Sequence, residues 1–276
     1  MQTKQQIQSL LAQAGLSPRH RFGQNFMIDQ NLLRLVAEAG RPSADDVIIE
    51  IGPGTGTLTE ELLASGAQVI AVEIDRDLAA LLGDRFRDQP CFRLIEGDAL
   101  DTKHALNTGL LAAIQQSQHP TKLIANLPYN IASPLIIEML LAGVQTLAFT
   151  VQKEVAQRLR AKPGTDDYGA LSVMAQLLSK VEILRTLPPT AFWPAPKIDS
   201  ALVRIMRDDR LGARAREFGA FLKKLFSSRR KTLRKTLTQL ELDGEAILNQ
   251  LHLDPNIRAE NLSPEQLLLL FDTLNG

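Results

Sequence analysis

The turn Glu50–Gly56, with the sequence E-I-G-P-G-T-G, constrains the fold more than any other segment of the chain. It follows the apolar run Val47–Ile49, which is typical of a buried parallel strand, and it precedes Thr57–Leu63, whose pattern predicts a helix. Glycine lacks a Cβ and tolerates positive φ, so such a turn lets a ligand approach the backbone closely. Thr57 or Thr59 stands where the dinucleotide fingerprint needs its third glycine. A nicotinamide or flavin dinucleotide is therefore disfavoured.

Polar side chains also follow the next strands of this pattern. Strands are predicted over Val69–Glu73, Phe92–Asp98, Lys122–Asn126 and Leu147–Val151, with helical patterns between them. Alternating β and α units predict an α/β fold, Rossmann-like, with a parallel sheet covered by helices on both faces. In open α/β sheets, ligands bind at the carboxyl ends of the strands, where these residues lie. The E-x-G-x-G-x-G turn resembles the first motif of S-adenosylmethionine-dependent methyltransferases.

The acidic strand ends suit a nucleoside ligand. Glu73 lies 21 residues beyond Gly52, where a doubly wound fold places a carboxylate that accepts hydrogen bonds from both ribose hydroxyls. Asp98 ends the third strand and can accept a hydrogen bond from the exocyclic amine of an adenine ring. Both residues are therefore candidate cofactor ligands.

The tetrapeptide Asn126-Leu127-Pro128-Tyr129 suits methylation of an exocyclic amine on a planar base. The lone pair of adenine N6 is delocalised into the ring, so the amine is a poor nucleophile. The side-chain oxygen of Asn126 and a backbone carbonyl around Leu127–Pro128 can accept from the amine and aim its lone pair. Pro128 fixes φ, and Tyr129 offers a ring on which a base can stack, worth roughly 1–3 kcal/mol. A plain β-turn after a strand is the alternative explanation.

Two later segments raise further candidates. The stretch Pro188–Pro196 is too rich in proline for a central strand, so we expect a loop over the sheet edge. The flanking prolines favour Phe192 as a stacking residue on a rim, although a core aromatic is the alternative. Beyond Asp209 the pattern is all-helical, and we expect a domain of residues 1–208 with an N-terminal cofactor and RNA loop, followed by a helical domain of residues 209–276.

The net charge is zero, but the charges are unevenly distributed. Twelve basic residues and three acidic ones lie between Arg204 and Lys235, a local excess that favours a phosphate backbone as partner. A solvated helix face is the alternative explanation. The candidate RNA-binding residues are Arg21, Lys223, Arg229, Arg230, Lys231 and Arg234.

Composition disfavours other classes of protein. A single cysteine and four scattered histidines predict no metal site. No apolar run approaches the ~20 residues of a membrane span, and the N-terminus lacks the apolar core of a secretory signal. We therefore expect a cytoplasmic protein without a membrane partner, and a monomer.

The chain also resembles the KsgA family of small-subunit ribosomal RNA adenine dimethyltransferases. The resemblance covers both expected domains almost from end to end. The matching stretches are Arg21–Phe26, Glu50–Gly56, Gly97–Ala99, Asn126–Asn130, Val151–Ala156, Tyr168–Val173, Phe192–Arg204, Phe226–Leu233 and Arg258–Glu260. One departure is Met27, where the family usually has leucine, and a backbone contact there would survive the change.

The resemblance implies a function in detail. It implies S-adenosylmethionine as cofactor, and Tyr129 and Phe192 on either side of the target adenine. The substrate would be two adjacent adenosines in a hairpin loop near the 3′ end of small-subunit rRNA, each dimethylated at N6, with a role in small-subunit biogenesis. The cofactor site would comprise Asn25, Met27, Gly52, Gly54, Glu73, Asp98 and Asn126.

Two alternatives remain open. An Erm-type enzyme would apply the same chemistry to large-subunit rRNA. A ribosome assembly factor would mainly bind the immature small subunit, although the intact tetrapeptide at Asn126 argues that catalysis is retained. Pro128 and Tyr129 are then catalytic candidates together with Asn126 and Phe192.

Overall fold

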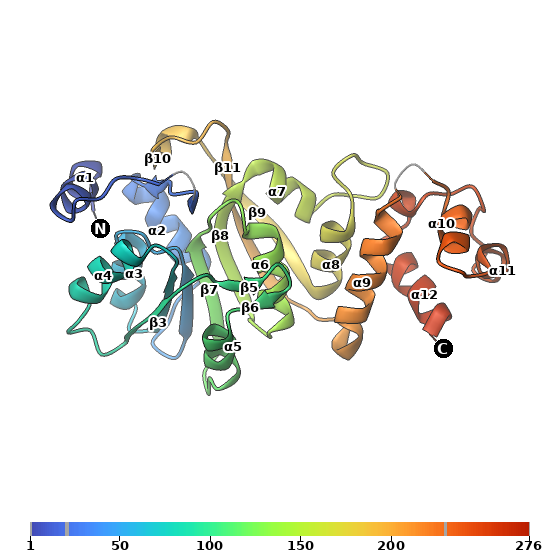
Figure 1. Ribbon diagram of the computed structural model, residues 1–276, viewed down its shortest axis with the longest axis horizontal. Helices are drawn as coiled ribbons and strands as arrows, with labels where there is room; N and C mark the ends of the chain where they lie inside the picture. The colour runs from blue at the N-terminus through green and yellow to red at the C-terminus, as the bar shows by residue number, and fades with distance from the viewer. Residues whose placement is uncertain (1, 20–21, 229–230, 276) are drawn as a thin grey trace. The chain divides into compact units, whose positions relative to one another are not determined.

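The computed structural model describes residues 2–19, 22–228 and 231–275, which divide into two compact units (Figure 1). The first comprises Met1–Ala156 and Val181–Arg207, and the second comprises Gln157–Lys180 and Asp208–Gly276. The second unit resumes at Asp208, next to the expected boundary. It also contains Gln157–Lys180, which the sequence expectation assigned to the first domain.

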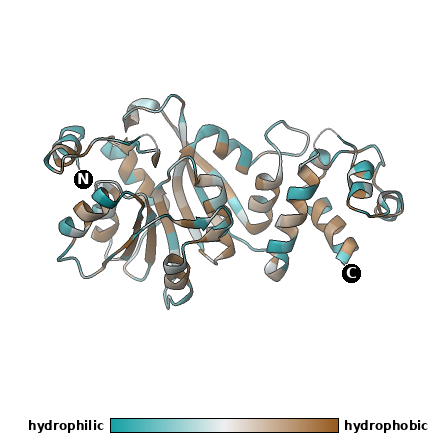
Figure 2. Cartoon of the chain, in the orientation of Figure 1, coloured by the Kyte–Doolittle hydropathy of each residue, from teal (hydrophilic) through white to brown (hydrophobic). Residues whose placement is uncertain are grey.

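A seven-stranded sheet forms the centre of the first unit, in the order β4-β3-β2-β7-β8-β11-β9. Pairing is parallel from β4 to β8, which confirms the predicted α/β fold, but β11 runs antiparallel to β8 and makes the sheet mixed. The central strands are predominantly hydrophobic, as expected for a sheet buried on both faces (Figure 2). The strands are β2 (Val47–Ile51), β3 (Gln68–Glu73), β4 (Phe92–Glu96), β7 (Thr121–Asn126), β8 (Thr146–Gln152), β9 (Ser179–Leu187) and β11 (Ser200–Arg207).

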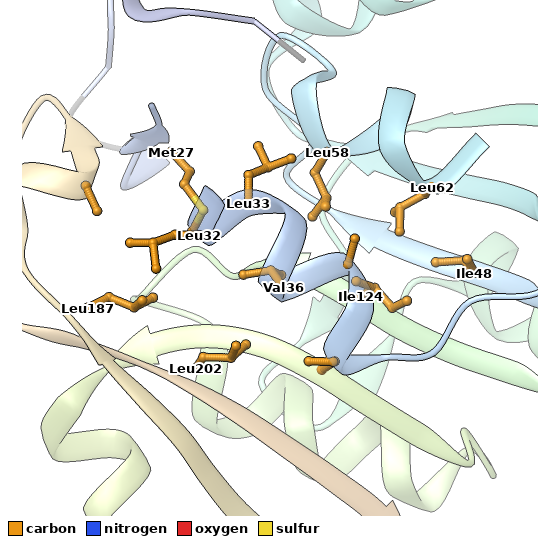
Figure 3. Packing of buried hydrophobic residues seen from close by; sticks show 14 of the residues in the cluster. Met27, Leu32, Leu33, Val36, Ile48, Leu58, Leu62, Ile124, Leu187 and Leu202 are labelled. Atoms are coloured by element: carbon orange, nitrogen blue, oxygen red, sulfur yellow. The ribbon is translucent and has the colours of Figure 1, made fainter. Parts of the chain in front are cut away.

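Helix α2 packs on this sheet, whereas α1 packs against β1 and α4. Helix α2 begins after the capping residue Asp29, whose carboxylate accepts from the backbone N–H groups of Asn31 and Leu32. Its apolar face, including Val36, packs over Ile48 and Ile124 of the sheet (Figure 3). The helices of this unit are α1 (Lys4–Gln13), α2 (Gln30–Ala39), α3 (Thr57–Ala64), α4 (Arg76–Arg85), α5 (Thr108–Gln115) and α6 (Ala132–Leu141), and the chain leaves the unit within α7 (Lys153–Leu159).

Short strands complete the first unit. The segment Pro188–Pro196, expected to be a loop, contains the 3₁₀ turn η2 (Pro189–Ala191) and the strand β10 (Phe192–Trp193). Strand β10 pairs antiparallel with β1 (Phe26–Met27), so this part of the loop expectation was wrong. The sequence offered no partner for two isolated residues, because the pairing joins segments more than 160 positions apart. A hairpin of β5 (Leu100–Thr102) and β6 (Ala105–Leu106) was also not anticipated.

The second unit is helical. Its core contains Phe218 and Phe271, whose rings meet edge to face at 5.3 Å between centroids, and Tyr168, whose hydroxyl donates to the Leu262 carbonyl at 2.8 Å. The Gly164 N–H donates to the Glu260 carbonyl at 2.8 Å. These bonds explain why Gln157–Lys180 belongs to this unit. Its elements are α8 (Ala170–Leu178), η3 (Gly212–Arg214), α9 (Ala215–Phe226), α10 (Leu233–Gln239), α11 (Gly244–Gln250), η4 (Ala259–Asn261) and α12 (Pro264–Asn275).

Candidate functional site

A pocket lies at the carboxyl ends of the parallel strands in the first unit. It brings together residues that were predicted from separate strand ends and from the N-terminal loop. Convergent polar groups in an otherwise apolar pocket are typical of a small-molecule site. Nine predicted residues line it, namely Asn25, Met27, Gly52, Gly54, Glu73, Asp98, Asn126, Pro128 and Tyr129.

The glycine turn forms the floor of this pocket and requires glycine. Gly52 and Gly54 have φ of 68° and 62°, in the left-handed region that other residues rarely adopt. A Cβ at Gly54 would lie 2.8 Å from the Phe26 ring, and one at Gly52 would lie 3.2 Å from the Pro128 ring. The turn therefore packs closely against both the N-terminal loop and the Asn126–Tyr129 segment. This contact places the candidate cofactor turn directly beside the candidate base site.

Two buried carboxylates lie behind and beside the turn. Glu73 accepts from the backbone N–H groups of Gly54 at 3.2 Å and Asp75 at 2.9 Å. Glu50 accepts from the Thr59 hydroxyl at 2.6 Å. Burial, together with the neighbouring charge of Glu73, raises the pKa of Glu50 to about 8, and burial raises the pKa of Glu73 to about 7. Only Glu73 has two backbone donors to stabilise a negative charge, so near neutral pH we assign the charge to Glu73 and the proton to Glu50.

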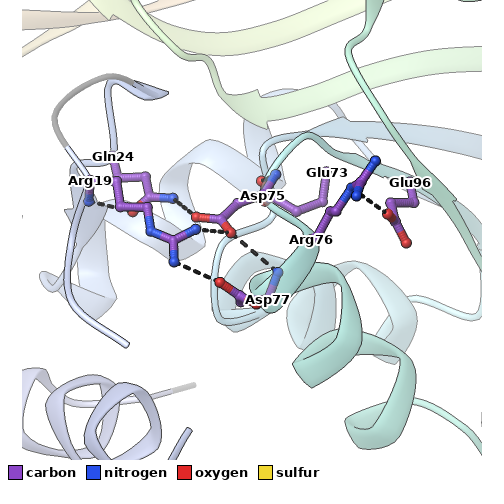
Figure 4. A network of polar contacts seen from close by, with 7 residues as sticks. All are labelled: Arg19, Gln24, Glu73, Asp75, Arg76, Asp77 and Glu96. Atoms are coloured by element: carbon purple, nitrogen blue, oxygen red, sulfur yellow. Dashed lines mark hydrogen bonds and ion pairs between the residues drawn. The ribbon is translucent and has the colours of Figure 1, made fainter. Parts of the chain in front are cut away.

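An ion-pair network holds the N-terminal loop against the strand end after β3 (Figure 4). The Arg19 guanidinium binds the carboxylates of Asp75 at 2.7 Å and Asp77 at 2.6 Å. Gln24 donates to Asp75 at 3.0 Å and accepts from the Arg19 backbone N–H at 2.7 Å. Asp75 is only 3% exposed, and its own N–H binds Glu73. The loop wall of the pocket is thus fixed to the candidate ribose ligand, a connection that sequence reasoning missed.

The side-chain amide of Asn126 is held on both sides. Its Nδ2 donates to the backbone carbonyl of Asn25 at 2.8 Å, and its Oδ1 accepts from the Thr150 hydroxyl. A carbonyl can only accept a hydrogen bond, so the contact with Asn25 determines which end of the amide is nitrogen. Asn25 also donates through its own Nδ2 to the Gly23 carbonyl at 3.1 Å. These hydrogen bonds therefore fix the orientation of Oδ1, the predicted acceptor for the target amine.

The two aromatic candidates differ in position. Tyr129 lines the pocket, and its hydroxyl lies 2.6 Å from the Ser200 hydroxyl, which fixes the ring. Burial raises the pKa of Tyr129, so the phenol is neutral. Phe192, in contrast, is 2% exposed within the core cluster, and the expectation that it lies on a rim was wrong. The β10 pairing with Met27 turns its ring inward, while Trp193 stacks on Phe26 at 6.2 Å.

Three of the six candidate RNA-binding residues lie within the described part of the chain. Lys223 on α9 and Lys231 before α10 are exposed, and Arg234 forms an ion pair with Glu245 at 3.6 Å. This acidic neighbour reduces the positive field that the sequence suggested. Arg21, Arg229 and Arg230 lie outside the described residues.

Within residues 2–19, 22–228 and 231–275, no group of three or more His, Cys, Asp or Glu side chains could hold a metal ion. In the same part of the chain, every helix is too short or too polar to cross a bilayer.

Comparison with known proteins places this site in context. Residues 15–276 match the family described as Ribosomal RNA adenine dimethylase. A protein of Hahella chejuensis named Ribosomal RNA small subunit methyltransferase A is 43% identical over 263 residues, covering 94% of this chain and 93% of the relative. A protein of the same name from Magnetococcus marinus is 43% identical over 273 residues, covering 97% and 95%.

Solved structures extend this comparison. A dimethyladenosine transferase from Plasmodium falciparum is 25% identical with a TM-score of 0.73, covering 90% of this chain and 96% of that structure. The 23S rRNA methyltransferase ErmE is 27% identical with a TM-score of 0.65, covering 91% of this chain and 100% of that structure. Both similarities span the two units described above.

Proposed function

This chain belongs to the ribosomal RNA adenine dimethylase family, and we propose on that basis that it dimethylates N6 of two adjacent adenosines in a hairpin loop near the 3′ end of small-subunit rRNA. It is an S-adenosylmethionine-dependent rRNA adenine dimethyltransferase. The structural observation that supports the proposal most is the position of Asn126. Its amide is fixed by Asn25 in the same pocket as the glycine turn, and Pro128 of the same segment packs against Gly52.

The pocket suits S-adenosylmethionine. When bound, this cofactor supplies an electrophilic methyl group on a sulfonium centre. Glu73 and Asp98 offer carboxylate acceptors for ribose hydroxyls and for an adenine amine, and both line the pocket. Gly52 and Gly54 line the pocket in the left-handed region, and the absence of a Cβ lets Pro128 and Phe26 pack close to the turn. The walls contributed by Asn25 and Met27 complete the proposed cofactor site.

The target base is held by the Asn126–Tyr129 segment. Oδ1 of Asn126 accepts one N6–H bond, and a backbone carbonyl accepts the other. The Leu127 carbonyl and the Pro128 carbonyl are the candidates for this role, and the Pro128 carbonyl, which accepts from the Ile131 N–H at 3.3 Å, keeps a second lone pair. The Tyr129 ring supplies a stacking surface. Chemistry then depends mainly on positioning, and the amine can lose its proton to water after the new N–C bond has made it cationic.

The comparisons support the small ribosomal subunit as the partner. The relatives named for the small subunit are 40–43% identical, whereas the 23S rRNA enzyme ErmE is 27% identical. We therefore favour the small subunit as the partner, bound by a monomer in the cytoplasm where ribosomal subunits mature. The proposed RNA contacts are the exposed Lys223 and Lys231 together with Arg234, and the sequence adds Arg21, Arg229 and Arg230.

The experiment that tests this proposal offers radiolabelled S-adenosylmethionine with either small or large subunits that lack their adenine methyl groups. Label on the small subunit, released by nuclease as N6,N6-dimethyladenosine, is the expected result. Label confined to large-subunit rRNA would assign the chain to the Erm-type activity instead. Tight binding to the small subunit without incorporation of label would indicate that the chain is a binding factor with a methyltransferase fold.

A further inference from the structure

We propose that Thr150 is a positioning residue for methyl transfer, which holds the Asn126 amide in the orientation that accepts the target amine. The proposal rests on the proposed function and deepens it. Thr150 lies within strand β8 and was not a candidate from the sequence, because a threonine in a buried strand has no distinguishing pattern. Its significance comes only from what its two oxygen atoms contact.

Thr150 forms two hydrogen bonds with the residues at the end of β7. The strands run parallel in a register that places Thr150 beside Asn126. The Thr150 carbonyl accepts from the Leu127 backbone N–H at 3.2 Å, and its hydroxyl donates to Oδ1 of Asn126. Its accessible surface is 0%, so the hydroxyl is shielded from water and depends on this partner. One residue therefore fixes both the backbone and the side chain at the start of the base-binding segment.

The two contacts of the amide act together. The Asn25 carbonyl determines the position of Nδ2 at 2.8 Å, and the Thr150 hydroxyl engages Oδ1 on the opposite end. An amide oxygen has two lone pairs, so one remains for an incoming N6–H. A hydroxyl that donates to the same oxygen also polarises the amide carbonyl. Loss of the hydroxyl would leave the amide held at one end only, with Oδ1 free to rotate away from the amine.

The second methyl transfer should depend on this arrangement more than the first. Adenosine N6 carries two N–H groups, which two acceptors can hold. N6-methyladenosine carries one, so its alignment relies on a single hydrogen bond. A loosened Asn126 should therefore slow conversion of the monomethyl to the dimethyl product more than it slows the first step. The product ratio is a readout that a purely structural role of Thr150 would not change.

The test compares Thr150→Val, which keeps the shape and removes the hydroxyl, with Thr150→Ser, which keeps the hydroxyl. Thr121→Val makes the same change in a buried threonine at the other end of β7 and serves as the matched control. In single-turnover reactions with unmethylated small subunits, we expect Thr150→Val to slow the first methyl transfer about tenfold. The second methyl transfer should slow by a larger factor, so that N6-methyladenosine accumulates. Thr150→Ser and Thr121→Val should stay within about threefold of the unmodified chain.

A substrate-free measurement separates this proposal from the proposed function. In protein with ¹⁵N-labelled asparagine, the Asn126 side-chain amide, identified by its loss in Asn126→Ala, should exchange with solvent about fivefold faster in Thr150→Val. Thermal unfolding of each variant shows whether it folds, and Thr150→Ser supplies the comparison if Thr150→Val does not. Unchanged exchange and an unchanged product ratio in Thr150→Val would overturn the positioning role. Altered exchange in a protein that methylates neither subunit would show that Thr150 fixes the Asn126 amide and would refute the proposed function, and with it a role of Thr150 in methyl transfer.

Discussion

The side chain of Gln2 engages both polar groups of Thr55 in the glycine turn. Its Nε2 donates to the Thr55 carbonyl at 3.0 Å, and its Oε1 accepts from the Thr55 hydroxyl at 2.7 Å. Both residues are buried, at 5% and 2% exposure. Gln2 precedes the family match, which begins at residue 15. A segment outside the matched region thus supports the turn that lines the cofactor pocket.

Replacing Gln2 should weaken cofactor binding without changing chemistry. Gln2→Ala removes two buried hydrogen bonds from the turn, each worth about 1 kcal/mol, so we expect S-adenosylmethionine affinity to fall by up to about thirtyfold. The single-turnover rate at saturating cofactor should stay near that of the unmodified chain. Calorimetric titration measures the affinity, and Gln13→Ala, an exposed position at the end of the helix that follows Gln2, is the control. Equal affinity in Gln2→Ala and the unmodified chain would refute this role.

Glu50 should make the cofactor-free protein less stable as pH rises. Its folded-state pKa of about 8 lies above its ordinary value of 4.5, so the folded protein retains a proton that the unfolded chain releases. The contribution of this proton to the free energy of unfolding is complete below pH 4.5 and is lost as the pH rises towards 8, by up to about 1.4 kcal/mol per pH unit. Glu50→Gln keeps an acceptor for the Thr59 hydroxyl and removes the titration. Urea unfolding at pH 6 and pH 8 should show Glu50→Gln gaining stability relative to the unmodified chain at the higher pH, and a constant difference would contradict the assignment.

The hydroxyls of Tyr129 and Ser200 should act as a unit. Tyr129→Phe and Ser200→Ala each remove the 2.6 Å contact that fixes the ring, and each should slow single-turnover methylation several-fold. The double variant should be no slower than the worse single variant, because the same interaction cannot be lost twice. Rates from the four proteins complete the thermodynamic cycle. Additive effects of the two substitutions would show that the contact does not position the ring.

Lys231 should contribute to the salt dependence of RNA binding. Its side chain is exposed, so Lys231→Gln should reduce the slope of log affinity against log salt by about 0.7–0.9 if it neutralises one phosphate. Arg234→Gln should have a smaller effect, since Glu245 already pairs with Arg234. Lys180→Gln, an exposed lysine paired with Asp208, is the charge-matched control. Filter binding to small subunits over a salt series measures the slope, and an unchanged slope in Lys231→Gln would exclude a phosphate contact.

Strand ends were the most predictable part of this molecule. A buried parallel strand is a short apolar run, and the residue after it lies at the ligand-binding edge, so Glu73, Asp98 and Asn126 could be placed together from the sequence. The cap at Asp29 and the requirement for glycine at Gly52 are equally local. Each follows from hydrogen-bonding capacity or φ at one position, and the structure confirms those local features.

Long-range pairings were not predictable in the same way. The inward orientation of Phe192 depends on its pairing with Met27, and the role of Thr150 depends on the register between two strands. Arg19 gains its function from two aspartates more than 50 positions away. In each case the sequence alone is compatible with several environments for the side chain. The tertiary structure determines which one occurs, because the stabilising contacts join segments that are far apart in the sequence.

The most direct test of the central claim is single-turnover methylation by Asn126→Ala on unmethylated small subunits, with subunit affinity measured in parallel. If the amide of Asn126 aims the adenine amine, methylation should fall at least about a hundredfold while subunit affinity stays within about twofold. Asn126→Ala that methylates at the rate of the unmodified chain would contradict the account.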